Sequence, residues 1–441
     1  MFIEQINSLI SSIIKNSLYF VDYQKTKIKD LIFSLKGNAR AMLITEPNWT
    51  IPIAWFGIYS PIYMLALGVS KLEIGLITSL AIAVQAIGTV LGGVFADKWG
   101  HKKTLIIFDS ISWPVSMIIF AFAQDIWWFV VGVVINNLCY IVLPAWHCLF
   151  IEGVSKDKRA NIYAVLQIAL NGASLFVPIA GVIVDGLGLV TGCRIMYGMA
   201  SISMILGIVY RGIKTKDTKV SEEVIKNKKS YSFKDELIKF KEAFLSIKNR
   251  EELFWFSIVQ ILVAFALIMW NTYYPVFLTD PKGVGLTESA ISIFPFIFSV
   301  VMISIIVIFI PQIKEKDFKK YLLIGTSLSI VSAFLYVFTP LYKMSFIALA
   351  SILNGIWMAF FRPLSDAYSM NILTDTERAR ILSVFNTLII IAVIPAAPLA
   401  GKLYTIYPRL TFIAVGIILI ITLLIIKFKF SYGEEGDKKS N

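Results

Sequence analysis

The feature that most constrains this chain is a series of long apolar stretches joined by short polar links. A helix needs about 20 mostly apolar residues to cross the hydrocarbon core of a bilayer. Twelve such stretches lie along the sequence, at 41–66, 73–96, 104–122, 126–150, 160–186, 194–210, 253–278, 287–310, 320–339, 344–370, 378–404 and 409–430. Because the apolar runs are continuous and do not alternate, they satisfy their backbone polar groups as helices, not as barrel strands. The sequence therefore predicts an all-α polytopic membrane protein with twelve spans.

The composition excludes several other classes. Of the 441 residues, 57% are hydrophobic and 16% are charged, against about 45–50% and about 25% in soluble domains. Intrinsic disorder requires the opposite balance, and three cysteines are too few for a disulfide scaffold. The net charge of +12 would suggest nucleic acid on a soluble chain. On a membrane chain it bears on orientation, and no nucleic-acid partner is expected.

One link is much longer than the others and divides the chain. The central loop 211–252 separates two predicted six-helix bundles, 41–210 and 253–430. A cytoplasmic segment, 1–40, precedes the first bundle, and a cytoplasmic tail, 431–441, follows the second. Isoleucines near the N-terminus are spaced as one helix face, so the first segment is expected to be either an interfacial helix or an unstructured tail.

The basic residues are distributed unequally between the two sides of the predicted membrane. If the N-terminus is cytoplasmic, 34 Lys and Arg residues lie on the cytoplasmic side, 6 lie on the opposite side, and Arg362 lies inside a span. The positive-inside rule therefore predicts that both termini lie in the cytoplasm, and we expect the protein to lie in the cell membrane. A wrong or odd number of spans would have mixed the cytoplasmic basic residues with those of the opposite side, so the unequal distribution supports the count of twelve spans.

The two halves resemble each other in sequence. The matched segments are 61–63 with 275–277, 68–73 with 283–288, and 158–160 with 377–379. The matches occur in the same order and at nearly constant offset, which indicates a duplicated six-helix unit. Parallel halves of this kind are a transporter architecture, with the binding site near the midplane between them.

The link between the second and third stretches reads GVFADKWGHKK from Gly93 to Lys103. It resembles the signature loop of the major facilitator superfamily, in position as well as in sequence, and the resemblance covers essentially the whole chain. The signature positions are Gly93, Asp97, Lys98, Gly100, Lys102 and Lys103. The resemblance implies a monomeric secondary transporter that moves a small solute by alternating access, with a coupling proton and without cofactor or metal.

The signature loop has a physical role in such a transporter. Gly93 lacks a side chain, so the eleventh span is expected to approach it closely. Asp97 would meet the N-terminus of that span, where Thr374 and Glu377 have capping-box spacing. A contact of this kind contributes about 0.3–1 kcal/mol when exposed and up to ~2 kcal/mol when partly buried. That size suits a gate that must open in every cycle. The lysines of the loop serve either the gate or topology alone.

The fifth stretch contains Pro178 and Gly181, in the segment 177–182. These residues partly resemble the Gly-Pro-x-x-Gly-Gly motif of antiporters in the family, with two positions matching and two not. The alternative is a proline kink with close helix packing. The motif favours export.

Polar residues inside four spans form a candidate cavity layer, because the first, fourth, seventh and tenth spans line the cavity in this family. They are Glu46, Asn48, Asn136, His147, Gln260, Asn271, Arg362 and Asp366. Ionisable groups in spans are costly and usually functional. We hypothesise that these residues bind the solute and that Glu46 or His147 carries the coupling proton.

Each ionisable residue also has a structural interpretation. Arg362 and Asp366, one turn apart, suit a structural or gating salt bridge, and His147 suits a packing role. Pro47 favours the first helical position, which would leave Glu46 exposed at the cytoplasmic mouth of the first span. Asp109 is expected to lie off the cavity and to help pack the signature loop.

The functional alternatives come from different classes. A polytopic membrane enzyme is disfavoured because the chain has two histidines and no nucleophile elbow or phosphate-binding loop. A sensor built on a transporter scaffold stays open. Within the transporters, Glu46 near Trp49, together with aromatic residues of the seventh span, favours efflux of drug-like hydrophobic or cationic compounds. Proton-coupled uptake of sugars or other metabolites is the alternative, since sugar porters also use Asn, Gln and Trp.

Overall fold

The computed structural model describes residues 35–152, 154–218, 221, 241–242, 244–373 and 378–430. This part of the chain consists of helices and their links, and no strand occurs within it. The predicted interfacial segment 1–40, most of the central loop 211–252 and the tail 431–441 fall largely or wholly outside these residues.

The N-terminal half contains six spans, several of which are built from consecutive helices. They are α2 (Gly37–Thr45) with α3 (Pro47–Ala66); α4 (Lys71–Trp99); α5 (His101–Ser110), η1 (Ile111–Val115) and α6 (Ser116–Ala121); α7 (Ile126–Asn137), η2 (Leu138–Ile141) and α8 (Leu143–Ile151); α9 (Lys156–Gly172), η3 (Ala173–Phe176) and α10 (Val177–Leu187); and α11 (Leu189–Lys214). Prolines at or near the helix starts explain several breaks: Pro47 opens α3, and Pro178 occupies the first turn of α10.

The C-terminal half repeats the plan with fewer interruptions. Its helices are α14 (Glu251–Thr279); η4 (Ala290–Ser292), α15 (Ile293–Ile308) and η5 (Ile310–Gln312); η6 (Glu315–Asp317) and α16 (Phe318–Phe338); α17 (Met344–Ile372); α18 (Arg378–Val393) and α19 (Ala396–Ile406); and α20 (Pro408–Lys429). Among the described residues, 11 helices or helix series are long and apolar enough to cross a membrane. The 20-residue helix α3 occupies the place of a twelfth span, and its Pro, Asn, Trp and Tyr residues lower its hydropathy. The predicted all-α polytopic fold is confirmed.

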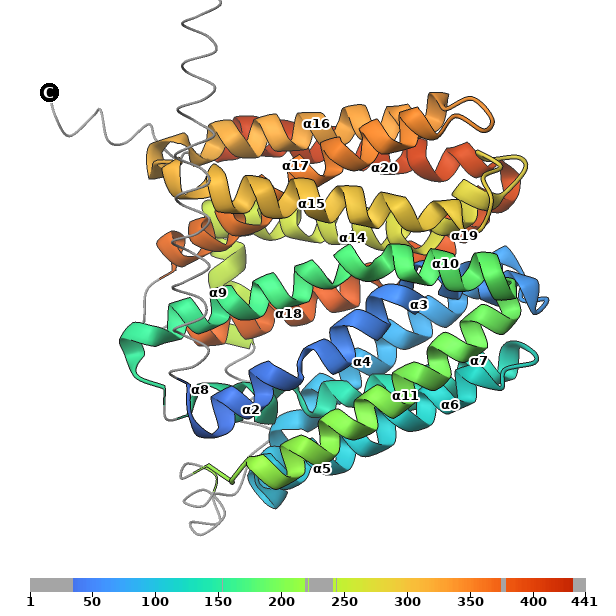
Figure 1. Ribbon diagram of the computed structural model, residues 1–441. Coiled ribbons are helices and arrows are strands. Elements are labelled where there is room, and N and C mark those ends of the chain that lie inside the picture. The colour runs from blue at the N-terminus through green and yellow to red at the C-terminus, as the bar shows by residue number, and fades with distance from the viewer. Residues whose placement is uncertain are drawn as a thin grey trace, which may run out of the picture.

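Figure 1 shows most of the N-terminal half, blue to green, below most of the C-terminal half, yellow to red, while α18 lies among the helices of the N-terminal half. We call the side of the bundle where α2 begins and α20 ends the terminal side, at left in the figure, and the opposite side the distal side. The halves meet where α4 packs against α18 and α19, where α9 and α10 pack against α15, and where α3 packs against α14. The interface between the two halves is therefore formed by α3, α4, α9 and α10 on one side and by α14, α15, α18 and α19 on the other.

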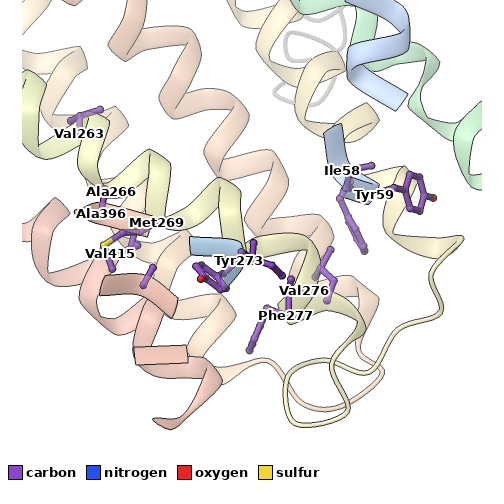
Figure 2. Packing of buried hydrophobic residues seen from close by; sticks show 14 of the residues in the cluster. Ile58, Tyr59, Val263, Ala266, Met269, Tyr273, Val276, Phe277, Ala396 and Val415 are labelled. Carbon is purple, nitrogen blue, oxygen red and sulfur yellow. The ribbon is translucent and has the colours of Figure 1, made fainter. Parts of the chain in front are cut away.

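The buried core continues across the boundary between the halves. Figure 2 shows Tyr273 and Phe277 of α14 near its distal end, with Ala396 of α19 and Val415 of α20 packed along the same helix. Tyr59 of α3 belongs to the same cluster and is fully buried. The distal part of the interface is therefore a continuous, close-packed core.

Candidate functional site

A cavity with a volume of about 390 Å³ lies almost entirely in the C-terminal half. Its lining residues are Ser174, Leu267, Trp270, Asn271, Tyr274, Phe294, Pro295, Phe298, Tyr336, Ser351, Asn354, Trp357, Met358 and Arg362. Ser174 on η3 is the one contribution of the N-terminal half to this set. The other residues come from α14, α15, α16 and α17, so the second half of the repeat builds the cavity.

Aromatic rings form much of the cavity wall. Trp270 and Tyr336 meet edge to face with ring centroids 4.5 Å apart, and Tyr274 and Tyr336 do so at 5.7 Å. Such pairs add about 0.5–1.5 kcal/mol to the stability given by burial alone, and they fix the orientation of each ring. A wall of fixed rings offers flat apolar faces to a solute that carries rings of its own.

The polar groups of the cavity are few, and one of them is charged. Arg362 is the sole charged residue among the described lining residues, and it is exposed. Asp366 lies one turn further along α17 and is also exposed. No ion pair joins these two residues among the described contacts, so the salt bridge suggested by their spacing is absent from this conformation. Asn271 and Asn354 add amide groups to the lining.

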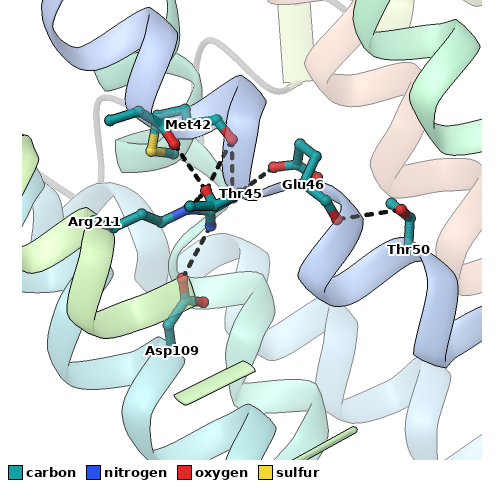
Figure 3. A network of polar contacts seen from close by, with 7 residues as sticks. Met42, Thr45, Glu46, Thr50, Asp109 and Arg211 are labelled. Atoms are coloured by element: carbon teal, nitrogen blue, oxygen red, sulfur yellow. Dashed lines mark hydrogen bonds and ion pairs between the residues drawn. The ribbon is translucent and has the colours of Figure 1, made fainter. Parts of the chain in front are cut away.

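Glu46 does not reach this cavity. It lies between α2 and α3 and is buried inside the N-terminal half, where its Oε1 accepts a hydrogen bond of 2.7 Å from Nη2 of Arg211 (Figure 3). Arg211 Nε also donates to Thr45 Oγ1 at 2.8 Å, and its guanidinium lies 3.9 Å from the ring centroid of Trp49. The sequence placed Arg211 in the central loop, but α11 continues to Lys214 and buries it. Carboxylates of two neighbouring spans lie near the guanidinium, that of Glu46 at 2.7 Å and that of Asp109 at 3.6 Å.

The other predicted cavity residues are dispersed. Asn48 donates to the Ser203 carbonyl at 2.8 Å, and Asn136 donates to Ser116 Oγ at 3.0 Å, so both join helices within the N-terminal half. His147 is exposed on α8, with its Nδ1 3.4 Å from the hydroxyl of Tyr163. Gln260 is half-buried on α14. Of the eight predicted residues, the structure brings Asn271 and Arg362 into the described cavity lining.

Among the described residues, no close approach to Gly93 is seen, and the first residues of the eleventh span lie outside them. A Cβ atom added at Gly93 would meet nothing within 4 Å, whereas one added at Gly92 would lie 2.7 Å from the Ile141 carbonyl oxygen. The closely packed glycine therefore faces the fourth span of its own half, not the eleventh span. Asp97 is half-buried. Its predicted partners, Thr374 and Glu377, lie outside the described residues.

The signature loop is instead held by residues that follow α11. Gly100 has φ +87°, a conformation that favours glycine, and it precedes α5. Asp217 Oδ1 accepts hydrogen bonds from the backbone N–H groups of His101 at 3.0 Å and of Lys102 at 3.3 Å. It therefore satisfies donors of the first turn of α5. Sequence reasoning missed Asp217, because capping across 115 residues or more leaves no local pattern.

The lysines of the loop differ in their surroundings. Lys102 donates from Nζ to the Thr215 carbonyl at 2.8 Å, which adds to the attachment of the segment after α11. Lys103 Nζ lies 5.9 Å from the ring centroid of Trp99. Lys98 is exposed on the last turn of α4. Lys102 thus has a described structural partner, and Lys98 has the exposure expected of a charge that sets topology.

An ion pair joins the two halves on the distal side. Lys71 Nζ at the start of α4 donates to Asp280 Oδ2 at 2.6 Å, and Tyr404 OH donates to the same oxygen at 3.1 Å. Tyr273 OH donates to the Lys71 carbonyl at 2.7 Å. Burial works against the charged form of Asp280, but the hydrogen bonds and the Lys71 charge outweigh it and lower the pKa of this carboxyl. Asp280 is therefore ionised and paired at neutral pH.

Close packing reinforces this distal contact. A Cβ atom at Gly75 of α4 would lie 2.5 Å from the Ala397 carbonyl oxygen, and one at Gly181 of α10 would overlap Ser292. Ser79 also donates to the Ile394 carbonyl across the boundary. Pro178 breaks the fifth span before α10, and Gly181 packs directly on η4. The kink-and-packing interpretation of this pair accounts for its described contacts.

A family model described as the Major Facilitator Superfamily matches residues 48–316 and 314–441. The multi-drug resistance efflux pump PmrA of Streptococcus pneumoniae is 27% identical over 186 residues, which cover 38% of this chain and 46% of that protein. The multidrug resistance protein MdtG of a Rahnella species is 25% identical over 162 residues, covering 32% and 39%. The matched region thus spans less than half the length of each of these relatives.

Solved structures resemble the whole fold. The nucleoside transporter NupG superposes with a TM-score of 0.69 at 16% identity, covering 90% of this chain and 99% of that chain. A POT family transporter in complex with 5-aminolevulinic acid gives 0.66 at 13% identity, covering 90% and 99%. At these identities the likeness concerns the fold alone.

Proposed function

This chain belongs to the major facilitator superfamily of membrane transporters, and we propose that it exports hydrophobic, drug-like compounds from the cell by proton-coupled alternating access. The observation that carries the proposal is the aromatic cavity in the C-terminal half. The partial relatives are multidrug efflux proteins, and they support the direction of transport. The protein would act as a monomer in the lipid bilayer. It would bind the solute and the coupling proton.

The cavity lining refines the expected solute. The sequence favoured hydrophobic or cationic compounds, because Glu46 was expected near the aromatic residues. In the structure that carboxylate is paired with Arg211 in the other half, and the charged group in the described lining is Arg362. A positive charge in a site of low polarity repels cations. We therefore favour neutral or anionic compounds with planar rings.

The distribution of the basic residues supports one orientation of the protein in the membrane. With the terminal side in the cytoplasm, the positive-inside rule is satisfied, and the distal side faces the exterior. The distal contact of Lys71 with Asp280 then closes the exterior side. Arg362 lines the cavity and is exposed on the part of α17 nearer the terminal side. The cavity would therefore be accessible from the cytoplasm. This conformation would receive a solute from the cytoplasm, as the first step of export.

Uptake of a polar metabolite is the second candidate. Asn271 and Asn354 place amide groups beside Trp270 and Trp357 in the cavity, a combination that also suits sugars or nucleosides. A transporter-derived sensor would share the same site without net transport. These candidates differ from export in the direction and the identity of the solute that moves.

Transport in proteoliposomes with an imposed pH gradient tests the proposal. The panel should contain planar aromatic compounds of similar size that are neutral, anionic or cationic, together with a labelled sugar and a labelled nucleoside. We expect proton-driven movement of the neutral and anionic aromatic compounds, a marked loss in Trp270→Ala, and none in Trp127→Ala, whose ring is exposed on α7. Preferred movement of the cation, the sugar or the nucleoside would contradict the proposed solute class, and no movement of any compound would contradict export.

A further inference from the structure

Three charged side chains are buried together in the N-terminal half. Their exposed fractions are 7% for Glu46, 3% for Asp109 and 2% for Arg211. They come from three different spans, at the junction of α2 with α3, on α5 and on the last turns of α11. Figure 3 shows the two carboxylates on opposite sides of the guanidinium. We call these residues the buried triad.

The contacts within the buried triad are unequal. Arg211 Nη2 lies 2.7 Å from Glu46 Oε1, which is hydrogen-bond distance, whereas Arg211 Nη1 lies 3.6 Å from Asp109 Oδ2. The second distance is too long for a hydrogen bond. Thr45 and the Met42 carbonyl accept further bonds from the guanidinium. Arg211 is therefore hydrogen-bonded to Glu46 and its neighbours through Nε and Nη2, and Asp109 is only near its Nη1.

The charges of the buried triad do not balance when both carboxylates are ionised. One guanidinium against two carboxylates leaves one negative charge in a buried site, and such a charge costs several kcal/mol. When two carboxylates share one cation, the usual solution is that one of them keeps a proton. Among the described residues, Arg211 is the single cation within ion-pair distance of either carboxylate. Two further described groups interact with Asp109: the Trp113 indole, whose hydrogen bond favours the ionised carboxylate, and the Cys139 thiol. Neither supplies positive charge.

We propose that Asp109 binds a proton and that the buried triad is the site at which the coupling proton is taken up and released. This inference rests on the proposed proton-coupled transport and moves the proton from Glu46 or His147 to a residue outside the cavity. The proton binds a carboxylate oxygen of Asp109 and returns to water when the carboxylate ionises again. Glu46 keeps its ion pair with Arg211 while Asp109 is protonated.

The position of the buried triad provides a route to the moving parts. Ionised Asp109 would compete with Glu46 for Arg211, and the guanidinium would move from α3 toward α5. Helix α3 packs against α14 of the other half, so a shift of α3 reaches the cavity wall. Helix α5 begins at the signature loop, where Asp217 caps it. The proton on Asp109 thus biases two elements that a change of access must move.

Infrared spectroscopy of the purified protein tests the site without requiring transport. We expect a protonated-carboxyl band at neutral pH in the wild type, its loss in Asp109→Asn, and its retention in Asp185→Asn, a matched exposed aspartate on α10. An unchanged band in Asp109→Asn, or no such band in the wild type, overturns the proposal.

Transport measurements complete the test. Asp109→Asn should lose accumulation driven by a pH gradient while it still exchanges solute across the membrane without a gradient. Gradient-driven accumulation at the wild-type level in Asp109→Asn overturns the proposal, even if the wild type exports as proposed. If the wild type moves no compound while the band behaves as expected, the proposed function fails and the proton site stands.

Discussion

The two halves of this protein share one fold but bury different chemistry. The N-terminal half encloses the buried triad of Glu46, Asp109 and Arg211, and the C-terminal half encloses a cavity with aromatic walls and one exposed charge, Arg362. The sequence repeat aligns Glu46 with Gln260, which is half-buried and uncharged. A duplicated scaffold therefore carries an ionic cluster in one copy and a solute-sized cavity in the other. We infer that the N-terminal half binds the coupling proton and that the C-terminal half binds the solute.

The largest effect that separates the halves is expected from their arginines. Arg211→Ala would leave two buried carboxylates without a cation, which costs about 3–5 kcal/mol of folding free energy. Arg362→Ala removes an exposed group without an ion-pair partner among the described residues, so stability should barely change while solute binding falls. Thermal unfolding of the purified variants measures the difference. Equal losses of stability would show that the halves do not differ in this way.

A smaller effect is expected at the distal contact between the halves. Gly75→Val would press side-chain atoms against the Ala397 carbonyl and the Tyr273 hydroxyl, and overpacking of this kind costs about 1–3 kcal/mol. Because the clash exists only when the distal side is closed, the variant should favour the distal-open state. Cysteine labelling from the distal side measures the shift. Gly93→Ala on the same helix is the control, since no described atom lies within 4 Å of its added Cβ. Equal labelling of Gly75→Val and Gly93→Ala from the distal side would show that packing at Gly75 does not close the distal side.

The smallest effect is expected from the ion pair of Lys71 with Asp280. Lys71 is partly exposed to solvent, so removing its charge with Lys71→Met should cost about 0.2–1 kcal/mol and raise distal labelling slightly. The pKa of Asp280 is lowered, so its ion pair with Lys71 stabilises the closed distal side at any pH above the ordinary pKa of a carboxyl group. This stabilisation is lost only as the pH falls through the lowered pKa of Asp280. Distal labelling should therefore not depend on Asp280 between about pH 5 and 8. If distal labelling of the wild type changes between about pH 5 and 8 and that change disappears in Asp280→Asn, the proton-dependent group would be Asp280, outside the N-terminal half. That result would contradict the comparison.

The features predicted from the sequence are those that local pattern determines. Apolar length gave the spans, the signature loop gave the family, and Pro178 marked the break before α10. These signals are local because backbone hydrogen bonding and proline geometry act within a few residues.

The candidate site was predicted less well, because it depends on which face of a helix meets which neighbour. Glu46 was assigned to the cavity, since nothing in the local sequence reveals that Arg211, 165 residues away, reaches it. Arg211 was excluded because a charged residue ends a hydropathy run even where the helix continues. Gly93 and its neighbour Gly92 differ by 100° around α4 in an ideal helix, and the motif does not say which of them is packed.

The central claim is that proton and solute bind in different halves, and the protons exchanged on solute binding test it most directly. Calorimetry of solute binding in buffers with different ionisation enthalpies gives that number for the wild type, Asp109→Asn and Arg362→Gln. The account predicts that Asp109→Asn binds solute without exchanging a proton, whereas Arg362→Gln binds more weakly and still exchanges it. Proton exchange that persists in Asp109→Asn, or that is lost in Arg362→Gln while solute still binds, would contradict the account.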